Sequence, residues 1–178
     1  MKKYFIVVLF LLLVTLITLF ILNKINNLNN KDNYVAMVNG EGITKTDYGN
    51  EINETTTFFK FNHQKIDTPA LKKNVLDEMI DNTLISQYAA KHNIIVYQQE
   101  LDQRYSDAVR IYNSHNNITG ASDSAFITQI NKMYGMDKTE YQENLRMDIL
   151  KEKVQESVGE PLTKWLMDQK QSTQISIF

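Results

Sequence analysis

Three histidines are the side chains of this chain best suited to acid–base catalysis at neutral pH or to metal binding. His63, His92 and His115 lie far apart in the sequence, and no two of them have the spacing of paired metal ligands. Each is better explained as a surface or helix-end residue. The chain has no cysteine, which excludes thiolate nucleophiles, thiolate metal sites and disulfides. We therefore expect no metal site and no cofactor.

The acidic residues and the short glycine-containing motifs do not indicate a catalytic site either. Asp77, Glu78 and Asp81 fall on a helix face that the pattern leaves to water, whereas a carboxylate pair for acid–base catalysis needs burial. The segment Val38–Gly42 contains Gly-x-Gly but no third glycine, and neither a Walker motif nor Gly-x-Ser-x-Gly occurs. We expect no catalytic residue.

Aromatic and methionine side chains remain as candidates, and their chemistry is binding by apolar contact. Three phenylalanines within four positions near residue 60 cannot all face one side of a helix. Methionines and a tyrosine surround Gly135, and a flexible thioether suits a surface that accepts varied partners. Helical spacing of such residues is also typical of a core, so core and groove both stay open. The candidate peptide-binding residues are Phe58, Phe59, Phe61, Tyr105, Tyr112, Phe126, Met133, Tyr134 and Met136.

The elements that must position these side chains begin with a short strand over Tyr34–Val38. A tight turn on Asn39-Gly40 follows, because these residues tolerate a positive φ, and then a single apolar anchor, Ile43. Thr44 is placed to cap a helix, and Asp47 three positions later can reach back to it. This helix is expected from Lys45 to about Phe61.

Thr68-Pro69 predicts the start of a second helix, with Thr68 as cap and proline in the first turn. Its apolar residues recur every three or four positions up to His92-Asn93, as an amphipathic helix requires. The face left to water carries Lys72, Lys73, Asp77, Asp81 and Gln87.

Three further helices are expected in the second half of the chain. One carries Leu101, Tyr105 and Val109 and ends in a loop over residues 110–123. Another starts at Ser122 or Asp123 and carries Phe126 and Ile130. The last long helix opens at Asp137 or Thr139, with its buried side at Tyr141, Leu145, Ile149, Leu150 and Val154.

This layout resembles the N-terminal domain of the SurA/PrsA class of extracytoplasmic folding factors, which is trigger-factor-like, over roughly residues 34–178. The order and spacing of the residues carry the resemblance, not any single position. The matching residues are Val38, Asn39, Gly40, Ile43, Thr44 and Asp47, then Leu76, Ile80, Leu84, Ile85, Ala89, Ile94, Val96, Glu100 and Leu101.

The resemblance also implies that the two ends of the domain meet. Trp165-Leu166 and the segment 174–178 look like the family's closing helix and strand, and Ile175 and Ile177 would share one strand face. We predict that this strand pairs with Val35–Val38, giving a two-stranded ribbon. A frayed tail over Thr173–Phe178 is the alternative.

Family members that catalyse prolyl isomerisation carry a parvulin domain, on the order of a hundred residues, between these two end segments. Here only Ser157–Pro161 separates the helix ending near Glu156 from the one containing Trp165. The chain therefore looks like a member that lacks the parvulin domain and is not an enzyme.

Residues 1–22 predict a signal anchor. Tyr4 to Leu22 is apolar apart from two threonines, and about 20 such residues span a bilayer. Lys2 and Lys3 precede this stretch, which places the N-terminus in the cytoplasm and the rest outside. The stretch is longer than a cleaved signal peptide usually has, and it lacks an Ala-x-Ala site. PrsA-type proteins are usually held by a lipid-modified cysteine, and this chain has no cysteine that could carry the lipid.

Composition sets the remaining bounds. Residues 23–33 are a polar, asparagine-rich run that predicts a flexible linker, followed by one domain over 34–178. Without Lys2 and Lys3 the chain has 17 basic and 21 acidic residues, a net charge of −4, which does not suit nucleic-acid binding. Only two prolines and six glycines occur, which favours a mainly α fold.

Three functions follow. The first is a membrane-anchored, extracytoplasmic holdase chaperone that binds unfolded or newly exported polypeptides through apolar contacts, without catalysis. The second is an adaptor that uses the same fold to bind one specific envelope partner. The third and least favoured is a prolyl isomerase. Monomer and homodimer both stay open.

Overall fold

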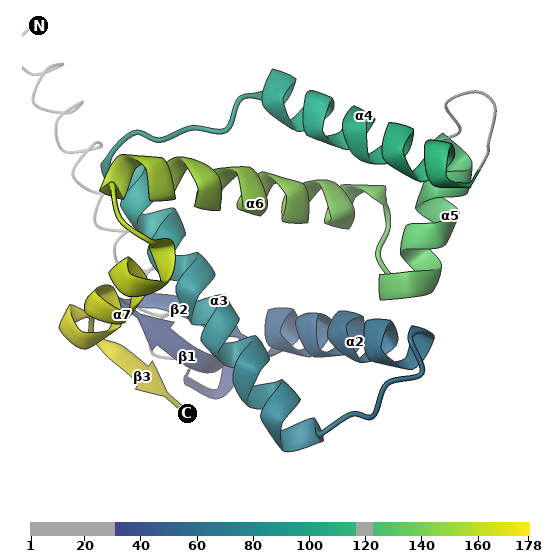
Figure 1. Ribbon diagram of the computed structural model, residues 1–178. Helices are drawn as coiled ribbons and strands as arrows, with labels where there is room; N and C mark the ends of the chain where they lie inside the picture. Colours follow the sequence, from purple (N-terminus) through teal and green to yellow (C-terminus); the bar gives the residue numbers. More distant parts are fainter. Residues whose placement is uncertain (1–30, 117–122) are drawn as a thin grey trace, which may run out of the picture.

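The computed structural model describes residues 31–116 and 123–178, and its elements are mainly helices (Figure 1). The helices and strands are η1 (Lys31–Asn33), β1 (Tyr34–Val38), β2 (Glu41–Thr44), α2 (Lys45–Phe61), α3 (Thr68–Lys91), α4 (Gln98–His115), α5 (Asp123–Tyr134), α6 (Lys138–Val158), α7 (Leu162–Ser172) and β3 (Ile175–Ile177).

The strands form one antiparallel sheet in the order β2-β1-β3, so the prediction of a two-stranded ribbon was wrong by one strand. The extra strand is β2, whose residues were expected to be a turn and one anchor. Asn39 and Gly40 have φ values of 51° and 83°, the positive values of a two-residue hairpin turn, and Val38 pairs with Glu41 across it. Ile43 then reaches the core as an inward-facing strand residue.

The predicted pairing of the domain's two ends is confirmed, and the frayed-tail alternative is wrong. Ala36 pairs with Ile177 and Val38 with Ile175. Two more hydrogen bonds extend the pairing: Asn39 N donates to the Gln174 carbonyl oxygen, and Phe178 N donates to that of Val35, each at 3.0 Å. The sheet thus closes the chain's described ends onto each other.

Helix α2 has the predicted bounds, and Thr44 caps it by accepting from Asp47 N at 3.0 Å. Helix α3 begins at Thr68 with Pro69 in its first turn, but its cap is Asp67, whose carboxylate accepts from Ala70 N, and not Thr68. Helix α4 continues to His115, beyond the loop start expected at residue 110. Of the two starts considered for α6, Asp137 is the cap.

Two polar residues of α3 that were expected to face water bind neighbouring elements instead. Gln87 Nε2 donates to the Val38 carbonyl oxygen and to the Glu41 carboxylate, both at 2.9 Å, and Gln87 Oε1 accepts from Asn39. Asp81 forms an ion pair of 2.6 Å with Lys170 of α7. Both contacts join α3 to elements far away in sequence, which a helical pattern does not reveal.

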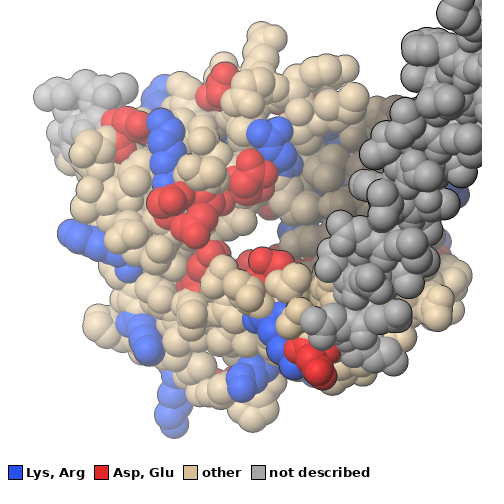
Figure 2. Space-filling model, turned by 180° about the vertical axis from the view of Figure 1, so that it is seen from behind, with Lys and Arg blue, Asp and Glu red and all other residues tan. Residues whose placement is uncertain are grey.

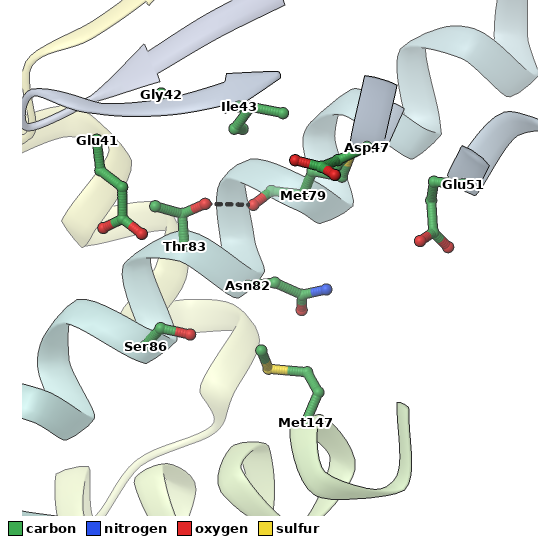
Figure 3. A pocket seen from close by; sticks show the side chains of 10 residues that line it. All are labelled: Glu41, Gly42, Ile43, Asp47, Glu51, Met79, Asn82, Thr83, Ser86 and Met147. Atoms are coloured by element: carbon green, nitrogen blue, oxygen red, sulfur yellow. Dashed lines mark hydrogen bonds between the residues drawn. The ribbon is translucent and has the colours of Figure 1, made fainter. Parts of the chain in front are cut away.

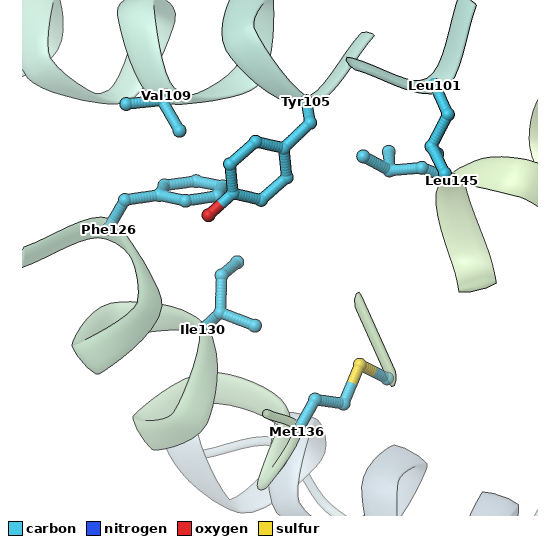
Figure 4. Close-up of a cluster of buried hydrophobic side chains, with 7 residues drawn as sticks. All are labelled: Leu101, Tyr105, Val109, Phe126, Ile130, Met136 and Leu145. Carbon is cyan, nitrogen blue, oxygen red and sulfur yellow. The ribbon is translucent and has the colours of Figure 1, made fainter. Parts of the chain in front are cut away.

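Three apolar clusters hold the molecule together as two lobes. In the proximal lobe, α3 packs on the sheet through Ile80 and Leu84. A second cluster joins α3, α7 and the end of α6 around Ile85, Val154 and Trp165. The distal lobe consists of α4, α5 and the first half of α6, with a core drawn in Figure 4: Leu101, Tyr105, Val109, Phe126, Ile130, Met136 and Leu145.

Helices α6 and α2 connect the lobes along two separate lines (Figure 1). Helix α6 passes from the distal core to α3 and α7, and α4 lies alongside it, with contacts that reach Glu152 and Lys153. Helix α2 leaves the sheet and ends against α5. The lobes are therefore joined as the sides of a ring and not as one packed mass.

Within residues 31–116 and 123–178, no helix combines the length and apolar composition needed to cross a bilayer. The predicted span over residues 4–22 lies outside the described residues. So does most of the predicted linker, of which residues 31–33 form the short helix η1. The loop expected near residue 120 also lies in part outside them.

Candidate functional site

A central opening lies between the lobes, bordered by α2, α3 and α6. Its volume is about 700 Å³, within the usual range of ligand pockets. Figure 2 shows the molecule hollowed here, with acidic side chains gathered around the hollow. The lining residues are Asp47, Glu51, Glu78, Asn82, Glu143, Asn144, Met147, Asp148 and Lys151.

The lining of the central opening is strongly acidic, with five carboxylates against one ammonium group. Lys151 pairs with Glu78 at 3.5 Å, and Arg146, which is not part of the lining, pairs with Glu143 at 3.3 Å. Among the described residues, Glu51 and Asp148 have no cation within ion-pair distance. The opening thus carries negative charge that the protein itself does not neutralise.

Burial and mutual repulsion act on the carboxylates of α2. Burial, more than the neighbouring Glu78, raises the pKa of Glu51, and Lys151 offsets only part of this. One turn further along α2, burial and the charges of Glu51 and Glu140 raise the pKa of Glu54 from 4.5 to about 7. These two groups gain a proton more readily than ordinary glutamates, because burial and neighbouring carboxylates both disfavour their charged form.

A smaller recess of about 240 Å³ adjoins the central opening on the side of β2 and shares Asp47, Glu51, Asn82 and Met147 with it. Figure 3 shows Asn82 of α3, Glu51 of α2 and Met147 of α6 around the same space. The hydroxyl of Thr83 already has a hydrogen-bond partner, because it donates to the Met79 carbonyl oxygen at 2.8 Å. The Asn82 amide oxygen is fully enclosed and has no hydrogen-bond donor among the described residues.

An apolar groove of about 240 Å³ lies at the turn between α2 and α3. Phe59, Ile66, Leu71 and Val75 supply its apolar lining, and Lys65, Asp67 and Glu78 lie at the same site. Phe59 is thus one predicted binding residue that lines a groove. This groove is lined by apolar side chains, whereas the central opening is lined by carboxylates, and Glu78 lies at both.

Most of the predicted binding residues lie in or on the distal core instead. Tyr105, Phe126 and Met136 are buried there, which is the position that the core alternative gives them. The Tyr105 hydroxyl also donates a hydrogen bond to the carboxylate of Asp123, which pairs with Lys138 at 2.8 Å. Tyr112 and Tyr134 pack on this core from outside, and Met133 is half-buried.

The three clustered phenylalanines of α2 have three different environments. Phe58 stacks on Tyr134 of α5 with ring centroids 5.1 Å apart. Phe59 lines the apolar groove, and Phe61 is 40% exposed. The expectation that they cannot share one face is confirmed.

None of the nine predicted residues lines the central opening. Sequence reasoning missed its carboxylates because acidic residues on helices were taken as solvated. A signal did exist: Asp47 and Glu51 on α2 are four positions apart, as are Glu78 and Asn82 on α3, so each pair shares one helix face.

The histidines lie at helix ends, as predicted. His63 follows α2, His92 stacks on Tyr88 at the end of α3, and His115 closes α4. No group of three or more histidine, aspartate or glutamate side chains in the described parts of the chain is arranged to hold a metal ion. The features that the described residues do present are a charged opening and, beside it, an apolar groove.

Comparison with known proteins gives one family. The family model described as SurA-like N-terminal domain matches residues 1–155, which confirms the resemblance drawn from the sequence. No curated protein matches the chain.

Proposed function

The chain belongs to the family of SurA-like N-terminal domains, and we propose that it is a membrane-anchored, extracytoplasmic holdase chaperone. It would bind unfolded or newly exported polypeptides and release them without catalysis or nucleotide.

The central opening is the observation that carries this proposal. A domain evolved only for stability buries its helices against one another, whereas here three helices border a space of about 700 Å³. The space is large enough for a polypeptide segment. This favours a client-binding cradle over a filled adaptor surface.

The mode of binding differs from the purely apolar contact expected from the sequence. The opening presents carboxylates, and apolar contact is confined to the groove lined by Phe59 and its neighbours. Unfolded segments mix charged and apolar residues, so the two surfaces together suit such clients better than either alone.

Membrane attachment rests on the sequence of residues 4–22 and their preceding lysines. We propose a single-pass protein of the cell membrane, with its N-terminus in the cytoplasm. Because the chain is free of cysteine, Lys73→Cys would supply a single thiol on an exposed site of α3. Labelling of intact cells by a membrane-impermeant maleimide is expected. Labelling only after lysis would contradict this topology.

The non-catalytic part of the proposal rests on the connection between α6 and α7. It consists of residues 159–161, with Gly159 in a left-handed conformation that ends α6. Three residues leave no room for a catalytic insert at this place. A peptide assay of prolyl isomerisation should show no acceleration by the full-length protein.

Suppression of aggregation tests the central claim. The full-length protein in mild detergent, at a few-fold molar excess, should slow light scattering by several unrelated denatured proteins. A lack of effect on all of them contradicts the holdase. Crosslinking in native membranes then separates the alternatives, because one dominant partner would support an adaptor and many partners a chaperone.

A further inference from the structure

Helix α2 is attached to its surroundings less firmly than the other α-helices that the structure describes. None of its 17 residues is buried, whereas each helix from α3 to α7 buries at least one side chain. No residue of α2 belongs to any of the three apolar clusters. Because the burial of apolar surface is what resists the displacement of a helix, α2 is the side of the ring that moves at the lowest cost.

The far end of α2 meets the end of α5 along a seam formed by Thr57 and Phe58 on one side and Tyr134 and Gly135 on the other. Phe58 stacks on Tyr134, and a Cβ at Gly135 would lie 3.9 Å from Oγ1 of Thr57. Among the described residues, no hydrogen bond and no ion pair joins α2 to α5. The seam can therefore separate without leaving a buried polar group unpaired.

Like charges next to the seam favour its separation. Glu54 precedes Phe58 by one turn of α2, and Glu140 lies in the first turn of α6, directly after α5. Burial, and after it the charges of Glu51 and Glu140, raise the pKa of Glu54. When Glu54 and Glu140 are both ionised, their repulsion lowers the free energy that holds α2 against α5.

The central opening passes through the molecule, since the background is visible through it in Figure 2. The chain itself closes the ring between α2 and α3 and between α5 and α6, and the buried side chains Ile85 and Val154 join α3 to α6. Within the described parts of the chain, the seam is the boundary that neither the backbone nor a buried side chain closes. The middle of a long polypeptide enters such a ring only if the ring opens or one end of the polypeptide is threaded through it.

We propose that the seam between α2 and α5 is a gate, which opens to admit the middle of a client chain sideways into the central opening and closes behind it. The proposal rests on the proposed chaperone function and states the route by which clients reach its cradle. Threading needs a free end, whereas an unfolded segment flanked by folded parts has none. A gate held by half-buried apolar contacts serves both kinds of client.

The test locks the seam with a reversible crosslink in the full-length protein, in mild detergent. Because the chain has no cysteine, Phe58→Cys with Tyr134→Cys supplies two thiols and no others, on opposite sides of the seam. A short bis-methanethiosulfonate reagent joins the two thiols, and a reductant releases them. The same molecules are thus measured locked and unlocked.

The probe is one labelled, unstructured peptide of mixed charged and apolar residues in two forms. One form has a small folded protein fused to each end, and the other to one end only. A folded domain cannot pass the opening, so only the second form can thread. Locking should slow association of the doubly fused form by about tenfold or more and that of the singly fused form by less than about twofold, as measured by fluorescence anisotropy. Reductant should restore the original rate.

The control pair is Gln98→Cys with Asp102→Cys, two exposed residues of α4 whose side chains hydrogen-bond at 2.8 Å. The same reagent joins them without crossing the seam, so neither form should change. If the first pair fails to fold, Phe58→Ala weakens the seam by itself and should speed association of the doubly fused form by roughly threefold. Phe61→Ala, at an exposed site of the same helix, should not.

Three outcomes would overturn the gate: no change in either form on locking, an equal loss for both forms, or the same loss in the control pair. Suppression of aggregation by the unmodified protein is measured alongside. If suppression persists, the chaperone function stands and only the route of entry is wrong. If suppression is also absent, the function itself fails and the gate fails with it.

Discussion

The ring of Phe58 in α2 stacks almost parallel on the ring of Tyr134 in α5, with an angle of 8° between their planes. These residues are 76 positions apart, and they join the end of α2 to the distal lobe. The contact closes the ring of helices on the side away from the sheet. Neither ring lines the central opening, so this contact lies outside the opening and acts on the ring of helices around it.

Phe58→Ala should loosen this closure. We expect a loss of about 2 kcal/mol of unfolding free energy, below the cost for a fully buried phenylalanine because Phe58 is only half-buried. Hydrogen exchange should accelerate in α5 more than in α3. The control is Phe61→Ala, an exposed residue of the same helix, which should stay within about 0.5 kcal/mol. Equal effects of the two changes would contradict a closing role for Phe58.

Two glycines near the hairpin should respond to alanine in opposite directions. A Cβ at Gly42 would lie 2.2 Å from Cε1 of the Tyr34 ring, so Gly42→Ala forces that ring to move and should cost about 1–3 kcal/mol. A Cβ at Gly49 in α2 meets nothing within 4 Å, so Gly49→Ala should stabilise by about 0.5–1 kcal/mol through helix propensity. Thermal unfolding measures both. A stabilising Gly42→Ala would show that Tyr34 moves at no cost.

Lys153 fixes the connection between α3 and α4 to α6. Its Nζ donates to the Ile95 carbonyl oxygen at 2.7 Å and to the Glu100 carboxylate at 2.6 Å, and it lies 5.2 Å from the centre of the Tyr97 ring. Lys153→Met keeps the aliphatic stem and removes these contacts, so Tm should fall by a few degrees. Lys164→Met is the control, since the ion pairs of Lys164 lie within or next to its own helix turn. A larger fall for the control would show that the connection is held by other contacts.

Glu54 should make stability depend on pH in an unusual direction for a carboxylate. Its pKa of about 7 in the folded protein exceeds its ordinary value of 4.5, because of burial and then the charges of Glu51 and Glu140. The folded state thus binds more protons than the unfolded state between these values, and the stability from this group is lost as pH rises through 7.

Glu54→Gln cannot ionise and should escape this loss. The difference in Tm between the variant and the unmodified protein should therefore be more favourable to the variant at pH 8 than at pH 5. Glu156→Gln, at an exposed site on α6, should show no such trend. A difference that stays constant with pH would mean that Glu54 ionises normally.

Local signals explain which parts of the fold could be predicted. The bounds of α2 follow from a cap that acts over three residues, Thr44 to Asp47, and from helical spacing. The pairing of β1 with β3 is a long-range contact, and it was predicted only because the family resemblance supplied it. Strand β2 was missed because four residues after a turn are too few to show an alternating pattern.

The candidate site was harder to predict for a different reason. An aromatic residue has the same sequence pattern whether it contacts a client or another helix. The sequence therefore could not tell whether Tyr105 and Phe126 line a groove or lie in the core, where the structure has them. Glu51 and Glu78 each look like ordinary surface residues of their own helix. They become parts of one site only when α2 and α3 face each other across the opening.

By itself, the sequence determined the helices, the Thr44 cap of α2 and the meeting of the domain's two ends, because these depend on short-range periodicity and on a recognisable order of motifs. The tertiary structure alone decided that the helices border an acidic opening and that Tyr105 and Phe126 are buried in the distal core. Charge repulsion and burial depend on which side chains are close in space. The spacing of residues along one helix does not show which other helix lies opposite that face.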